Sequence, residues 1–197
     1  MVEVGGVIAL VGAIVLLGLL IALHVLPTGL SPASDPVSQY ALTRFGALYR
    51  WATIAAAIAG VGGLIVVAAT TSGVASLVAI VLLVVFIVSR ALIGFFPMDE
   101  PGRPRSRTGA VHGILAITAF GGIAAASFVV AGAFHDAGYG VLAVTSTTAG
   151  VVMVVGTVGM LVASRTRGRS VFGLAERLIY VGFIGWFVAV GVAGVLH

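Results

Sequence analysis

"RALIGFFPMDEPGRPRSRTGAVHG", residues 90–113, joins two long apolar runs of the chain. Arg90 lies six residues before Phe96, which places it about 9 Å inside the end of the first run if that run is helical. His112 lies near the start of the second run. Charged and imidazole groups at such depths are costly in lipid. The stretch therefore predicts a polar connection between two membrane-spanning helices that carry titratable side chains into the membrane.

The composition of the whole chain agrees with a membrane protein. Of its 197 residues, 60% are hydrophobic and 8% are charged, whereas a soluble domain carries about 25% charged residues. So few polar groups cannot cover a water-exposed surface. The chain has no cysteine, which excludes disulfides, thiolate metal sites and cysteine nucleophiles. The pI is near 10.4, but no soluble basic face exists to carry nucleic acid, and we expect no nucleic-acid partner.

Six segments are long and apolar enough to cross a hydrocarbon core of about 30 Å, which takes ~20 helical residues. They are residues 4–26, 51–69, 74–96, 109–134, 141–163 and 171–196. The first carries Glu3 in place of the positive n-region of a signal peptide, so we expect it to be retained. The predicted fold is an all-α integral membrane protein, a compact bundle of six transmembrane helices in one domain covering residues 1–197.

The arginines predict how this bundle is oriented. Its second and fourth connections are short, and all ten basic residues, every one an arginine, lie in or beside the three longer ones. Positively charged loops stay cytoplasmic. We therefore expect a multi-pass protein of the plasma membrane with its long loops in the cytoplasm and both termini outside.

Small residues recur at four-residue spacing, as in the pairs Ala56/Gly60, Ala59/Gly63 and Gly109/Gly113. Such pairs let helix backbones approach closely in lipid. We expect them to pack within one bundle, and homodimerisation through a Gly/Ala-rich helix face is the alternative.

Polar side chains gather at the predicted cytoplasmic end. Ionisable residues in a membrane usually pair with one another, so we expect Arg90 to pair with Glu176, or Arg177 with Asp99. Ser106 or Thr108 can cap the fourth helix.

The N-terminus of the fourth helix, beside three arginines, is a candidate cradle for a phosphate or carboxylate. An alternative is that these arginines only meet anionic lipid headgroups. In the first connection we expect either a short interfacial helix that turns Val37, Tyr40, Ala41, Leu42 and Phe45 towards lipid or a solvated loop.

Four stretches together resemble one known family. They are "SDPVSQYALTRFG" (34–46), "RALIGFFPMDEP" (90–101), "TGAVHG" (108–113) and "GLAERLIYVGFIGW" (173–186). Their order and spacing are similar to those of the DUF998 family of bacterial and archaeal membrane proteins, whose function is unassigned. The resemblance implies one shared polar constellation of Ser38, Arg90, Asp99, His112, Glu176 and Arg177.

The main functional hypothesis is a polar cluster on the cytoplasmic side that binds an anionic amphipathic lipid or prenyl-type molecule, with chemistry on that molecule as a further option. The candidate ligand-binding residues are Ser38, Arg44, Arg90, Arg103, Arg105, Arg107 and Arg177. The candidate acid–base residues are Asp99, His112 and Glu176, because burial pulls the pKa of such groups towards neutrality. No hydrolase, metalloprotease or P-loop signature occurs, so binding is favoured over catalysis, and no metal or cofactor is expected.

Three alternatives stay open at this point. The polar belt of a structural or accessory subunit would only lock the helices together. A small-solute or proton-coupled transporter would use the same carboxylates and histidines, but it usually shows repeats and polar residues near mid-membrane. A di-haem electron carrier would use His24 and His112 as one layer of ligands, with His135 and His197 as the other.

Overall fold

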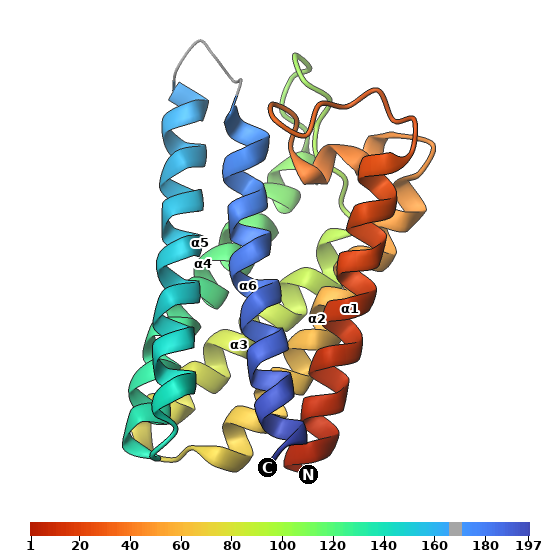
Figure 1. Cartoon of the computed structure of the whole chain (residues 1–197). Coiled ribbons are helices and arrows are strands. Elements are labelled where there is room, and N and C mark those ends of the chain that lie inside the picture. Colours follow the sequence, from red (N-terminus) through yellow and green to blue (C-terminus); the bar gives the residue numbers. More distant parts are fainter. Residues whose placement is uncertain (166–170) are drawn as a thin grey trace.

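The structure, a computed structural model, describes residues 1–165 and 171–197 and contains six long helices (Figure 1). They are α1 (Val2–Val25), α2 (Gly46–Thr70), α3 (Gly73–Ile93), α4 (Arg107–Asp136), α5 (Gly140–Arg165) and α6 (Phe172–Val195), and a short 3-10 helix, η1 (Val37–Leu42), precedes α2. Each long helix is long and apolar enough to cross a membrane, and no strand occurs among the described residues. The predicted all-α membrane fold with six spanning helices is confirmed.

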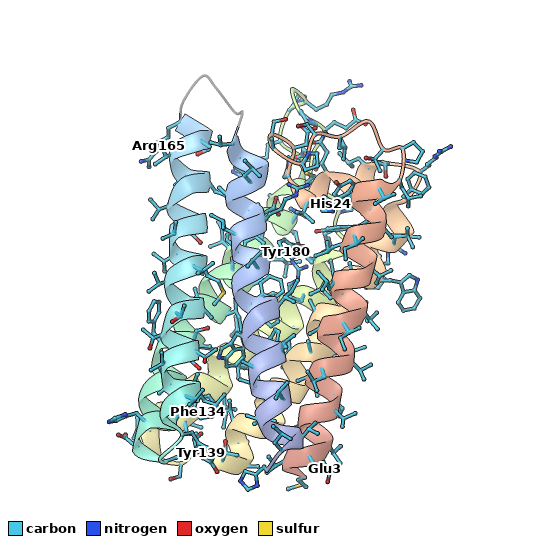
Figure 2. The ribbon with its side chains drawn as sticks, in the orientation of Figure 1. Glu3, His24, Phe134, Tyr139, Arg165 and Tyr180 are labelled. Carbon is cyan, nitrogen blue, oxygen red and sulfur yellow. The ribbon has the colours of Figure 1, made fainter. Side chains whose placement is uncertain are left out.

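The helices form a closed ring in chain order. Each helix packs against the next, α6 returns to pack against α1, and α6 also contacts α2. Both termini lie at one end of the bundle with the short connections (Figure 1). The connections before α2 and α4 lie at the opposite end, with the end of α5 and the start of α6, and we call it the long-loop end. Figure 2 shows His24 and Arg165 towards the long-loop end and Glu3 and Tyr139 at the other.

Several helix ends differ from the predicted spans. α2 begins at Gly46 rather than 51, α4 begins at Arg107 rather than 109, and α3 ends at Ile93 rather than 96. After Ile93 the backbone continues in tighter i→i−3 turns, because Pro97 cannot supply the N–H that a longer helix needs. Arg90 therefore lies in the last turn of α3, about 4.5 Å from its end, and not as deep along the helix as predicted.

The short helix in the first connection is present, but the expected orientation of Val37 and Tyr40 was wrong. Val37 and Tyr40 are each 1% exposed and do not face lipid. The backbone N–H of Leu174 donates to the carbonyl of Ala33, and the N–H of Val37 donates to the carboxylate of Glu176. These bonds hold η1 across the start of α6, so Val37 and Tyr40 turn inward, whereas Leu42 stays 38% exposed.

Small residues allow the closest helix contacts. A Cβ atom at Gly62 would overlap the backbone of Ala9, and one at Gly12 would come within 2.5 Å of the Ala59 nitrogen, so α1 and α2 meet backbone to backbone. Gly63, on another face of α2, contacts the ring of Phe187. The small residues of α2 are thus used in packing within the bundle.

Candidate functional site

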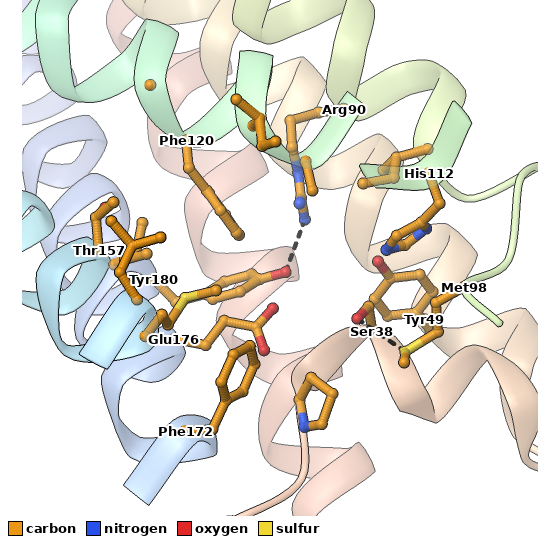
Figure 3. Close-up of a pocket in the computed structure, with 18 residues that line it drawn as sticks. Ser38, Tyr49, Arg90, Met98, His112, Phe120, Thr157, Phe172, Glu176 and Tyr180 are labelled. Atoms are coloured by element: carbon orange, nitrogen blue, oxygen red, sulfur yellow. Dashed lines mark hydrogen bonds between the residues drawn. The ribbon is translucent and has the colours of Figure 1, made fainter. Parts of the chain in front are cut away.

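A pocket of about 480 Å³ lies within the long-loop half of the bundle (Figure 3). Its walls come from α2 to α6 and from the connections that precede α2 and α4. We call it the Arg90 pocket and define it by Arg90, His112, Phe120, Thr157, Glu176 and Tyr180. The lining is mainly apolar, with a few polar groups that converge on it, as is common for ligand-binding pockets.

Helical spacing places these residues together. Glu176 and Tyr180 are four residues apart on α6, and His112 and Phe120 are eight apart on α4. Residues four apart lie on one face of a helix. One stripe of each helix therefore faces the pocket.

Among the described residues, Arg90 is a buried cation that forms no ion pair within 4.0 Å. It is 1% exposed, and its Nη2 donates to the hydroxyl of Tyr180 at 3.1 Å. Its guanidinium carbon lies 5.3 Å from the centre of the Tyr180 ring and 6.0 Å from the centres of the Phe120 and Phe183 rings. The Nε–H is buried and has no hydrogen-bond partner in the part of the chain that the structure describes.

The predicted Arg90–Glu176 ion pair was wrong. In the described part of the chain the ion pair within 4.0 Å joins Arg103 and Glu100, both exposed in the connection before α4. Glu176 is 4% exposed and accepts instead from the backbone N–H of Val37 at 2.7 Å. The inward fold of η1 gave Glu176 this partner, so Arg90 keeps its unpaired charge.

His112 and Ser38 complete the polar part of the pocket. The His112 Nδ1 lies 2.7 Å from the carbonyl oxygen of Phe96, and since a carbonyl only accepts, Nδ1 carries a proton. The Ser38 hydroxyl donates to the sulfur of Met98 at 3.2 Å. In Figure 3 the His112 ring lies beside Tyr49 and Met98, on the opposite side of the pocket from Thr157.

The pocket reaches the side of the bundle between α4 and α5. Ile117 on α4 is 75% exposed and Leu161 on α5 is 54% exposed, and both line the pocket. Exposed apolar residues on the flank of a membrane-spanning bundle face lipid. The Arg90 pocket is therefore open towards the hydrocarbon region.

A second pocket of about 350 Å³, the vestibule, lies at the long-loop end. It shares Pro36, Met98 and Phe172 with the Arg90 pocket, and its own lining includes Asp35 and Asp99. The vestibule is thus a polar, acidic neighbour of an apolar pocket that contains a cation.

Asp99 supports the N-cap of α4 and occupies the predicted anion cradle. Its carboxylate accepts from the Ser106 hydroxyl at 2.6 Å and from the Ser106 backbone N–H at 3.1 Å. These two hydrogen bonds lower the pKa of Asp99 below the usual aspartate value. Ser106 in turn accepts from the backbone N–H of Gly109, so Ser106 is the N-cap of α4. A Cβ at Gly109 would overlap the Asp99 carboxylate, which leaves no room there for an external anion.

Arg177 does not pair with Asp99 as predicted and lies outside the Arg90 pocket. Its Nε donates to His24 at 2.7 Å and its Nη1 donates to the carbonyls of Asp35 and Gly173. Its Nη2 lies 3.4 Å from the hydroxyl of Tyr40. Arg177 therefore joins α1, η1 and α6.

The same contacts occupy the ring nitrogens of His24, which was predicted as a haem ligand in the electron-carrier alternative. Its Nε2 accepts from Arg177 and its Nδ1 lies 2.6 Å from the carbonyl of Leu20. With both ring nitrogens engaged, His24 has no free lone pair for iron in this arrangement. Among the described residues, no group of three or more His, Asp or Glu side chains could hold a metal ion.

The remaining predicted arginines lie away from the pocket. Arg44 stacks over the ring of Phe45 at 4.7 Å, Arg103 pairs with Glu100, and Arg105 and Arg107 are exposed. The structure thus brings Ser38, Arg90, His112 and Glu176 together and leaves the other candidates outside.

Sequence reasoning missed Tyr180 and Phe120, the aromatic residues that surround the guanidinium. Their four- and eight-residue spacing from Glu176 and His112 was the signal that could have found them.

Comparison with known protein families assigns the chain to one of them. A family model described as "Protein of unknown function (DUF998)" matches residues 10–193. The chain belongs to the DUF998 family. The match covers the whole Arg90 pocket of this DUF998 protein, and the resemblance seen in the sequence is confirmed. No curated protein and no solved structure matches the chain.

Proposed function

We propose that this DUF998 protein binds an anionic amphipathic molecule, a lipid or a prenyl-type compound, in the Arg90 pocket. The anionic headgroup contacts Arg90, and the tail follows the apolar wall to the opening between α4 and α5. One observation carries the proposal: within the described chain, Arg90 is 1% exposed, forms no ion pair with a carboxylate and keeps a buried Nε–H without an acceptor.

The energetics favour an external anion. Burying an ion costs several kcal/mol even after relaxation, and this cost is offset when a counter-charge with good hydrogen-bond geometry is present. In the described chain Arg90 has only the Tyr180 hydroxyl and three aromatic rings. A ligand carboxylate or phosphate would supply the missing acceptor for Nε–H.

Any chemistry on the ligand would fall to His112 and Glu176, which line the pocket. Asp99 serves the cap of α4 instead. Binding alone accounts for the geometry, so we propose a binding protein first.

We also propose that the long-loop end faces the cytoplasm of a plasma membrane, with both termini outside. The arginines beside the long connections support this orientation. Because the chain has no cysteine, single cysteines at Pro101 and Ala137 report it directly. With an impermeant maleimide on intact cells, Ala137→Cys should be labelled and Pro101→Cys should react only after permeabilisation; the reverse pattern would invert the orientation.

The binding proposal is tested by native mass spectrometry of protein released from mild detergent. The wild type should retain an anionic amphiphile at one per chain, and Arg90→Met should lose it. Arg103→Met is the matched control, because Arg103 is an exposed arginine outside the pocket. An adduct that survives in Arg90→Met, or that disappears equally in Arg103→Met, would contradict the proposal.

A further inference from the structure

The ligand class can be narrowed from the charges that the Arg90 pocket buries; this step rests on the proposed function. Arg90 contributes one positive charge at 1% exposure and Glu176 one carboxylate at 4% exposure. Neither forms an ion pair within 4.0 Å in the described chain. With Glu176 ionised, the empty pocket is neutral overall, although its two charges are not in contact.

The other groups around Glu176 decide where a proton could go. Besides Arg90, the titratable or charged groups near Glu176 are Tyr40 on η1, Tyr49 on α2, His112 on α4, Arg177 and Tyr180 on α6, and His24 on α1 beyond Arg177. The described lining from α5 is Thr157, Met160 and Leu161, which do not titrate. Arg177 has its own acceptors in α1, η1 and α6.

An anion that enters this pocket leaves one negative charge in excess if Glu176 stays ionised. An uncompensated charge in an apolar site is strongly unfavourable. The excess disappears if Glu176 takes up one proton as the anion binds. Its hydrogen bond to the Val37 N–H does not oppose this, because a protonated carboxyl still has an oxygen that accepts.

We infer that the ligand is a long-chain monocarboxylic acid, which binds as the carboxylate on Arg90 while its proton passes to Glu176. The step is balanced: R–COOH and the Glu176 carboxylate become R–COO⁻ and the Glu176 carboxylic acid, with no charge added to the pocket. A phosphate monoester or a diphosphate brings a second negative charge that Arg90 cannot neutralise. A monoanion that is ionised at every pH, such as a sulfonate, brings no proton, so Glu176 must take its proton from water.

The two sides of the pocket agree with this class of ligand. The vestibule contains the carboxylates of Asp35 and Asp99, which offer no hydrogen-bond donor to an anion arriving from the aqueous side. The opening between α4 and α5, by contrast, faces lipid through Ile117 and Leu161. A protonated long-chain acid dissolves in the hydrocarbon region and can arrive by this route without carrying charge.

Four probes with the same chain separate these cases: oleic acid, oleyl sulfonate, oleyl phosphate and oleyl alcohol. Their binding to the full-length protein in nanodiscs made from uncharged lipid should be measured at mildly alkaline pH. Oleic acid and the sulfonate should bind, the phosphate should bind at least about tenfold more weakly than oleic acid, which corresponds to about 1.4 kcal/mol, and the alcohol should bind weakest.

Proton uptake is tested with the sulfonate, which cannot supply a proton. Its affinity for the wild type should fall about tenfold per pH unit in the alkaline range, as linkage to one proton requires. Calorimetry in two buffers of different ionisation enthalpy should give one proton taken up per sulfonate bound. This measurement needs no variant, so it stands even if a pocket variant folds poorly.

Glu176→Gln should make the sulfonate affinity independent of pH, because the amide keeps an oxygen for the Val37 N–H but cannot titrate. Glu100→Gln is the control, since Glu100 is an exposed glutamate outside the pocket, and it should behave as the wild type does.

The outcomes separate the two levels of the proposal. If no charged probe binds the wild type, or if all bind Arg90→Met equally well, the anion site itself is wrong. If the probes bind through Arg90 but the phosphate binds as tightly as oleic acid, or the sulfonate takes up no proton, the site stands and the carboxylic-acid class is wrong. A pH dependence that survives in Glu176→Gln and vanishes in His112→Gln would assign the proton to His112 and overturn the role of Glu176.

Discussion

Replacing Arg90 by methionine separates a ligand site from a structural lock. In the ligand-free protein the substitution removes the hydrogen bond to Tyr180, worth about 1.5–3 kcal/mol for a charged donor. It also removes cation–π contacts worth about 2 kcal/mol in a desolvated site. Against these losses stands the burial penalty of an unpaired guanidinium, several kcal/mol per ion.

Because these contributions nearly cancel, we expect Arg90→Met to change the free energy of unfolding by less than about 2 kcal/mol. Methionine is flexible enough to fill much of the vacated volume. A structural lock predicts otherwise, since breaking a buried charged pair costs about 3–5 kcal/mol.

The assay is reversible unfolding of delipidated protein in mixed micelles of a non-ionic detergent and dodecyl sulfate, followed by far-UV circular dichroism. Arg177→Met is the positive control, because it strips donors from His24 and from two backbone carbonyls; we expect it to lose at least about 2 kcal/mol. If Arg90→Met unfolds as readily as Arg177→Met, Arg90 is a structural residue and the ligand argument fails.

Three further predictions follow from other parts of the structure. Gly121→Leu should block the Arg90 pocket and reduce retention of the amphiphile without lowering the melting temperature, because a Cβ at Gly121 meets open space and leucine favours helix over glycine by about 1 kcal/mol. The control Gly132→Leu, on the same helix but away from the pocket, should keep the amphiphile. Equal loss in both variants would refute blockage of the pocket. The low pKa of Asp99 means that its hydrogen bonds to Ser106 stabilise the fold above the usual aspartate pKa of 3.8, and this stability is lost as the pH falls through the lower pKa of the folded state. Between neutral and acidic pH, the melting temperature of Asp99→Asn should therefore fall less than that of the wild type. Identical decreases would count against a role of Asp99 at the cap. Ser146→Ala should lower the free energy of unfolding by about 1–3 kcal/mol, because it leaves the buried Trp186 indole N–H without an acceptor. Thr145→Ala, which removes an exposed hydroxyl bonded within its own helix, should lower it much less in the same unfolding assay. Equal losses would show that the indole finds another acceptor.

Much of the candidate site lay beyond sequence reasoning for one physical reason. Opposite charges on neighbouring helices were expected to pair, yet Glu176 bonds to the backbone of η1 and Arg177 to three separate segments. These hydrogen-bond partners depend on how a loop folds over the helix ends, and the hydropathy of the sequence does not predict that. The same loop placement turned Val37 and Tyr40 inward.

The sequence by itself determined the kind of protein: its apolar runs specify six spanning helices, because only a helix satisfies its own backbone hydrogen bonds in lipid. It also indicated the polar end of the bundle, since Arg90, His112 and Glu176 are all close to helix ends at the long loops. Only the tertiary structure decided which of these groups share a pocket and which are already satisfied. The Arg90 Nε–H lacks an acceptor among the described residues because aromatic rings of α4 and α6 surround the guanidinium and the Glu176 carboxylate accepts from the Val37 N–H instead. That arrangement arises from helix packing and from the placement of η1 rather than from local sequence.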